Sequence, residues 1–206
     1  MIKAINRIRQ RYTFRQEQRN AAAIIAAWEQ SGKPAPSPGV RKQQIVREYQ
    51  AQYQLHTLVE TGTFLGDMIA AQLPNFTRLI SIELSERLYR DARKRFKNDA
   101  KVELYQGDSG KVLPRILPTI QEKALFWLDG HYSAGITALG DKYSPIVEEL
   151  EAIFQYNIGH ILLIDDARCF TGEEGYPTLA GLEQLIKSKH PAYSMTVADD
   201  VIRVTP

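Results

Sequence analysis

Short apolar runs alternate with longer, partly polar stretches from residue 55 to the end of the chain. Two of the runs, LFWL and ILLI, are continuously apolar, which is typical of strands buried on both faces of a sheet. The predicted strands are TLVE (57–60), LISIE (79–83), VELYQ (102–106), ALFWLD (124–129) and HILLID (160–165). The stretches between them predict helices over about 65–73, 85–98, 109–117 and 144–156.

This alternation predicts an α/β fold with a Rossmann-like, doubly wound, mostly parallel sheet and right-handed crossovers. A further helix is expected over about 177–189. YSMTV and VIRVT then follow, separated only by ADD, and are close enough to pair as an antiparallel hairpin. The sheet should therefore end in a C-terminal hairpin.

Residues 1–54 predict an N-terminal helical extension. Ile2, Ile5, Ile8 and Tyr12 recur three or four residues apart, as on one face of a helix. The proline-rich stretch 31–39 ends this helix, and a second one is expected over about 40–54. We therefore divide the chain into an arm or lid (1–54), with a linker at 31–39, and a body (55–206).

Charge is unevenly divided between these parts. The arm has ten Lys and Arg against three Asp and Glu, a net +7, which leaves −5 for the body. The arm lacks the interleaved aromatic residues of a nucleic-acid platform, so we expect a solvated amphipathic helix and no nucleic-acid partner. The apolar run at 21–28 is too short to span a bilayer, and the single Cys169 fits a reducing compartment. A cytoplasmic protein without a membrane span is expected.

Every strand of the parallel set ends on an acidic residue. In open α/β sheets, ligands bind outside the carboxyl ends of the strands, so these acids are candidate ligand-binding residues. A single surface acid is usually only solvated, but five successive strand ends are hard to attribute to chance. The residues are Glu60, Glu83, Asp108, Asp129 and the pair Asp165 and Asp166.

VETGTFLG (59–66) places Gly62 and Gly66 in the turn after the first strand. Glycine lets the backbone approach a ligand there, and the following helix supplies free N–H groups. Phe64 stands where a dinucleotide fingerprint has its middle glycine, which disfavours an enzyme of NAD or of a nucleotide sugar. A purely structural role of both glycines stays open.

The next two strand ends suit an adenosine-containing cofactor. Glu83 closes its strand where a carboxylate can accept hydrogen bonds from both hydroxyl groups of a ribose. Asp108 and Ser109 follow the third strand, where a side chain can meet an adenine edge. Asp108 is also a good N-cap for the next helix, and the two roles are compatible.

The motif order E-x-G-x-x-x-G, I-E, G-D-S, L-D and I-D-D, with a closing hairpin, resembles that of the class I S-adenosylmethionine-dependent methyltransferases. VETGTFLG, FWLDGH and LLIDDA are similar to the metal-dependent O-methyltransferases of the catechol, caffeoyl-CoA and macrocin types, over residues 55–206. The resemblance implies that Glu83 holds the ribose and that Asp108 and Ser109 face the adenine. The residues it places around the methionine part of the cofactor are Glu60, Gly62, Thr63 and Gly66, with Asp129 beside them.

The resemblance also implies that Asp129, Asp165 and Asp166 bind a divalent metal, Mg²⁺ or Mn²⁺. Adjacent strand ends lie about 4.8 Å apart. Like charges near 4 Å repel by roughly 4 kcal/mol at an effective dielectric of 20, so three carboxylates there need a cation. Hard oxygen ligands suit Mg²⁺ or Mn²⁺ better than zinc. The alternative is that Asp165 or Asp166 caps the next helix.

A metal beside the cofactor would bind a substrate hydroxyl, lower its pKa and orient its oxygen toward the methyl group. Plant and animal relatives place a lysine shortly after the strand-four aspartate, whereas this chain has His131 and Tyr132 there and Lys142 further on. We expect His131 to take the proton, with Asp129 as the second catalytic residue. His131 as a metal ligand, or as a partner of Asp129, stays open. The loop 130–145 is expected to form a lid.

We therefore predict an S-adenosylmethionine-dependent O-methyltransferase that uses Mg²⁺ or Mn²⁺ and acts on a hydroxyl group of a small molecule or a sugar. The sugar rests on the macrocin resemblance alone. A metal-independent class I methyltransferase and a non-catalytic S-adenosylmethionine-binding protein are the alternatives. In this family N-terminal helices often cover the active site or build a homodimer, and residues 1–54 are expected to do so.

Overall fold

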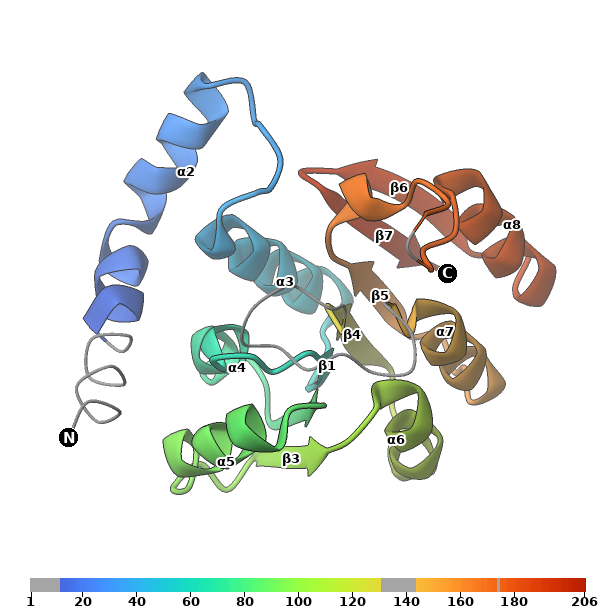
Figure 1. Ribbon diagram of the computed structural model, residues 1–206, viewed down its shortest axis with the longest axis horizontal. Helices are drawn as coiled ribbons and strands as arrows, with labels where there is room; N and C mark the ends of the chain where they lie inside the picture. The colour runs from blue at the N-terminus through green and yellow to red at the C-terminus, as the bar shows by residue number, and fades with distance from the viewer. Residues whose placement is uncertain (1–11, 131–143, 174) are drawn as a thin grey trace.

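A computed structural model describes residues 12–130, 144–173 and 175–206. They form a seven-stranded sheet of order β3-β2-β1-β4-β5-β7-β6 with helices on both faces (Figure 1). The first five strands pair in parallel, and β7 pairs antiparallel with β5 and β6. The predicted α/β sheet with a C-terminal hairpin is confirmed. The strands are β1 (Thr57–Thr61), β2 (Arg78–Glu83), β3 (Val102–Gln106), β4 (Ala124–Leu128), β5 (Ile161–Ile164), β6 (Ser194–Ala198) and β7 (Val201–Thr205).

The helices in the described ranges lie where the pattern predicts them and differ mainly at their ends, whereas Ile2, Ile5 and Ile8 of the predicted first helix lie outside those ranges. The helix expected from residue 65 begins only at Asp67, because Gly66 precedes it in the left-handed conformation. Ser85 starts the next helix by accepting a hydrogen bond from the Leu88 N–H. None of the helices in the described ranges is long and apolar enough to cross a bilayer. Residues 12–19 are helical. The helices that follow are α2 (Ala21–Gln30), α3 (Gly39–Tyr53), α4 (Asp67–Gln72), α5 (Glu86–Arg95), α6 (Ser109–Ile116), α7 (Ile146–Gln155), α8 (Leu179–Lys189) and the short 3₁₀ turns η1 (Leu117–Thr119) and η2 (Ala167–Cys169).

Both faces of the sheet are buried, which is why its central strands read as continuous apolar runs. Along β4, Leu125 and Trp127 face one core and Phe126 and Leu128 face the other. Helices α3, α4 and α5 contribute apolar side chains to the first core, and α6, α7 and α8 contribute to the second. The loops at the carboxyl ends of the strands are thereby left as one continuous edge.

Helix α3, predicted as part of the arm, packs directly on the sheet. Its Ile45 and Val46 are fully buried in the core that contains Trp127. By contrast, α2 buries only Trp28 and lies at the periphery of the molecule (Figure 1). The division of the chain at residue 54 stays a prediction, but α3 contributes to the same core as the body.

We expect Ile45→Ala to lower the free energy of unfolding by about 3 kcal/mol, because it removes buried methyl groups and leaves a cavity between α3 and the sheet. The same substitution at the half-buried Ile25 of α2 should cost much less. Urea denaturation of both variants measures the difference. Equal losses would mean that α3 is no more integral to the core than α2.

Candidate functional site

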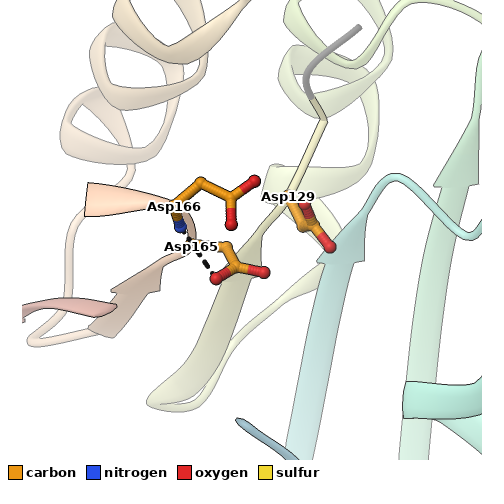
Figure 2. Close-up of side chains that lie close together, drawn as sticks. All are labelled: Asp129, Asp165 and Asp166. Atoms are coloured by element: carbon orange, nitrogen blue, oxygen red, sulfur yellow. Dashed lines mark hydrogen bonds between the residues drawn. The ribbon is translucent and has the colours of Figure 1, made fainter. Parts of the chain in front are cut away.

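Three carboxylates converge where β4 and β5 end. One oxygen of each of the residues Asp129, Asp165 and Asp166 lies within 4.8 Å of the other two, and Figure 2 shows the three side chains close together. They meet because β4 pairs in parallel with β5, which places the residues that follow both strands side by side. The Asp166 N–H donates to Asp165 Oδ1 at 2.8 Å, and neither oxygen of Asp166 caps η2. The predicted acidic cluster is thus assembled.

A lysine that the sequence analysis missed lies against this cluster. Lys42 of α3 donates from Nζ to Asp165 Oδ2 at 2.6 Å and to Asp166 Oδ1 at 3.2 Å. Its side chain is 16% exposed and that of Asp165 only 2%. The two residues are 123 positions apart, so no local motif connects them. The basic excess of residues 1–54 was the only signal in the sequence.

Further ion pairs extend from the cluster to the turn between β6 and β7. Arg168 donates from Nη1 to Asp166 Oδ1 at 2.7 Å and also pairs with Asp200. Arg41, next to Lys42, donates from Nη2 to Asp199 Oδ2 at 2.8 Å. The hairpin turn, α3 and the end of β5 are therefore joined by alternating charges.

Burial and charge act in opposite directions on these groups. Burial raises the pKa of Asp165, the neighbouring Asp129 carboxylate raises it further, and Lys42 opposes both. Burial acts to lower the pKa of Lys42, but the attraction of Asp165 and Asp166 outweighs it, so that pKa is raised. Lys42 is therefore an ammonium group at neutral pH.

The cluster suits a divalent metal in its donors but not in its charge balance. Three carboxylates are hard oxygen ligands of the kind that Mg²⁺ and Mn²⁺ prefer. However, the Lys42 ammonium already contacts two of them, and a metal ion on the same oxygens would meet a like charge at close range. With Lys42 in this position the residues do not fit a divalent ion, and no reaction step is assigned to one.

His131 lies outside the described residues, as do Tyr132, Lys142 and nearly all of the predicted lid 130–145. The predicted roles of His131 and of the lid therefore stay predictions. Gly130, which precedes His131, is described and directly follows Asp129 at the end of β4.

The glycine turn after β1 is shaped by its neighbours. Gly62 has φ +82°, and a Cβ there would lie 2.2 Å from the carbonyl oxygen of Asp129, so only glycine lets the ends of β1 and β4 come this close. Gly66 has φ +78°, and its Cβ would lie 2.7 Å from the ring of Phe96. The structure thus explains why both positions are glycine without any ligand, and the contacts of Gly62 and Gly66 with a cofactor stay predictions.

Glu83 is held by backbone donors at the end of β2. Its Oε2 accepts from the Phe64 N–H and its Oε1 from the Ser85 N–H, each at 2.8 Å, and the residue is only 6% exposed. Burial raises the pKa of Glu83, and the two backbone donors limit the rise. Because a carboxylate has about four acceptor positions, each oxygen keeps one for a ligand hydroxyl.

Glu60 and Asp108 form hydrogen bonds within the protein near the ends of β1 and β3. Glu60 is buried and accepts a hydrogen bond from Ser81, whose hydroxyl also contacts Thr63 Oγ1 at 2.6 Å. Burial holds the pKa of Glu60 well above its usual range. Asp108 caps α6 by accepting from the Gly110 N–H at 3.0 Å, as its alternative role predicted. Ser109, the first residue of α6, is buried.

A second functional candidate that the sequence analysis missed is Glu149 of α7. It is 1% exposed, and among the described residues its Oε1 has no hydrogen-bond partner. A Cβ on Gly130 would lie 2.9 Å from Glu149 Oε1 and 3.1 Å from Thr61 Oγ1, which is also unpartnered. Glu149 stands three positions after the buried Ile146, on the apolar face of the helix, and this spacing could have revealed it.

A small pocket lies beside these groups, lined in part by Gly130, Glu149, Asp165, Phe170 and Tyr176. Unpartnered buried oxygens cost free energy unless a water or a ligand satisfies them. The end of β4 therefore has polar groups that a bound molecule can complete.

Solved structures share this architecture. An O-methyltransferase of Bacillus cereus with bound S-adenosylhomocysteine matches with a TM-score of 0.55 at 14% identity, over 90% of this chain and 90% of the other. A methyltransferase of Podospora anserina, also with bound S-adenosylhomocysteine, matches with a TM-score of 0.57 at 16% identity, over 89% of this chain and 87% of the other. An O-methyltransferase of tomaymycin synthesis from Streptomyces achromogenes, with bound S-adenosylmethionine, matches with a TM-score of 0.52 at 17% identity, over 89% of this chain and 86% of the other. The chain has the class I methyltransferase fold.

At these identities the likeness shows the fold, and the predicted resemblance is confirmed at that level. No protein-family model matches the sequence, and a search of curated proteins found no match. The Glu149 side chain lies beside the end of β4. Burial raises its pKa to about 7, and the nearby hydroxyl groups of Ser109 and Thr61 limit the rise, although among the described residues Glu149 Oε1 has no hydrogen bond of good geometry.

We expect Glu149→Gln to remove a pH-dependent part of the stability. The native state keeps the Glu149 proton between about pH 4.5, the usual pKa, and about 7, so the contribution is complete below 4.5 and is lost as the pH rises through 7. Relative to the wild type, Glu149→Gln should gain on the order of 2 kcal/mol between pH 5 and pH 8. Denaturation at both pH values, with the exposed Glu151→Gln as control, measures it. An unchanged pH profile would contradict the assignment.

Proposed function

We propose that this protein is an S-adenosylmethionine-dependent methyltransferase that methylates a hydroxyl group of a small molecule. The observation that carries this proposal is the position of Glu83, held by two backbone donors beside the turn at Gly62. The sheet order reverses between β1 and β4, and open α/β sheets bind their ligands at such a switch point. The solved methyltransferases with S-adenosylhomocysteine or S-adenosylmethionine bound support the same cofactor here.

Bound S-adenosylmethionine supplies an electrophilic methyl group on a sulfonium. The free acceptor positions of Glu83 would receive the ribose hydroxyls. Gly62, Thr63 and Gly66 would lie along the methionine part, above the buried Glu60. Asp108 and Ser109 would face the adenine. The unpartnered oxygens of Thr61 and Glu149 supply further polar contacts at this edge.

The substrate hydroxyl must lose its proton as its oxygen takes the methyl carbon from sulfur. We assign that proton to His131, with Asp129 beside the reacting oxygen, because an imidazole titrates near neutral pH. The chain has no lysine immediately after Asp129, so a base other than lysine is expected at this position.

The sequence resemblance predicts Mg²⁺ or Mn²⁺ at Asp129, Asp165 and Asp166, and this metal is not part of the proposal. The ion pairs of Lys42 with Asp165 and Asp166 favour the alternative, a metal-independent methyltransferase. A sugar as the substrate, and a lid or a homodimer formed by residues 1–54, rest on the resemblance of the sequence to the macrocin-type enzymes and their relatives.

Calorimetric titration with S-adenosylmethionine and S-adenosylhomocysteine tests the cofactor. We expect both to bind the wild type. Glu83→Gln should weaken binding by about tenfold or more, because the amide loses an acceptor position and turns a donor toward the ribose or a backbone N–H. Glu86→Gln, an exposed change three residues away, is the matched control and should bind as the wild type does. If neither ligand binds the wild type, the proposed function fails.

A further inference from the structure

Lys42 is a charged group at the acidic edge that the proposed reaction does not use. Its Nζ lies 2.6 Å from Asp165 Oδ2 and 3.2 Å from Asp166 Oδ1, so one ammonium group bridges two of the three clustered carboxylates. Asp129 attracts the same ammonium group at longer range. Lys42 thus lies where the charge of a bound cation would be needed.

The backbone that carries Lys42 is fixed on several sides. Its neighbour Arg41 pairs with Asp199 at 2.8 Å, and the carbonyl of Gln43 accepts from Gln72 Nε2 at 2.8 Å. One turn further, Ile45 is fully buried in the core. Lys42 is therefore not a surface lysine that happens to swing toward an acid, but a side chain that α3 places at this edge.

Among the described residues, two basic side chains compensate part of the negative charge of the cluster, and one of them, Arg168, is shared with Asp200. Three carboxylates, Asp129, Asp165 and Asp166, face the ammonium of Lys42 and the guanidinium of Arg168, which contacts Asp166 at 2.7 Å. Asp165 is almost entirely buried, and removing the partner of a buried charge leaves it uncompensated. A divalent ion entering here would repel Lys42 or have to displace it.

We propose that the Lys42 ammonium is the resident cation of the acidic cluster and takes the place that a divalent metal has in the metal-dependent O-methyltransferases. Helix α3, from the basic N-terminal part of the chain, thereby completes the edge of the sheet where the acids gather. Lys42 acts as a positioning residue that holds Asp165 and Asp166. The assignment of this edge to an active site rests on the proposed function, but the identity of the cation does not.

The experiment is a titration of the protein with Mn²⁺, in which electron paramagnetic resonance measures the concentration of free Mn²⁺. We expect the wild type to show no Mn²⁺ site that depends on Asp165. Lys42→Met keeps much of the side-chain length but removes the charge, and it should bind Mn²⁺ about tenfold or more tightly than the wild type. Adding Asp165→Asn to Lys42→Met should abolish that gain. Lys42→Arg keeps the charge and is the matched control, which should remain without a site.

Two results would overturn the proposal. One is a wild-type Mn²⁺ site that Asp165→Asn removes, because the ion would then bind with Lys42 present. The other is a folded Lys42→Met variant that gains no Mn²⁺ affinity. If Lys42→Met does not fold, the titrations of the wild type and of Asp165→Asn still decide the first point. None of these titrations contains S-adenosylmethionine, so their failure is distinct from a failure to bind the cofactor.

Discussion

The parallel pairing of β4 with β5 imposes the constraint on which the rest of the site depends. Both strands are buried on their two faces and pair with Leu128 opposite Ile164. That register places Asp129 beside Asp165 and Asp166, and three carboxylates within 4.8 Å of one another require positive charge nearby. Lys42 and Arg168 provide it from segments on either side. The position of α3 thus follows from two needs, since it fills the core through Ile45 and supplies the ammonium group through Lys42.

The uneven charge of the chain gains a physical meaning from these contacts. Residues 1–54 carry a net charge of +7 and the remainder −5. Two of the basic residues form ion pairs with acids of the other part, Arg41 with Asp199 and Lys42 with Asp165. Because these pairs are partly buried, they are screened by salt less than surface pairs are. Part of the basic excess therefore serves contacts within the chain.

The edge of the sheet divides into two halves with different chemistry. Around β1 and β2, backbone N–H groups orient Glu83, and Gly62 passes against the end of β4, an arrangement suited to recognising hydroxyl groups. Around β4 and β5, ion pairs dominate. Glu149, whose Oε1 has no hydrogen-bond partner among the described residues, lies between the two halves. A molecule bound across the switch point would meet hydrogen-bond acceptors at one end and ion-paired side chains at the other.

The sequence by itself determined the strands, the helices and the closing hairpin, because apolar runs, helical periodicity and turn residues are local properties of the chain. It also placed an acid at the end of each strand of the parallel set. That Asp129, Asp165 and Asp166 come together was implied only by the family resemblance, not by the local pattern. Only the tertiary structure set β1 and β4 side by side, brought Lys42 to acids 123 residues away and buried Glu149 among otherwise similar acidic residues of its helix. It also explains Gly66, because a side chain at that position would collide with the ring of Phe96. These outcomes depend on packing and on charge balance between distant segments, which no local pattern contains.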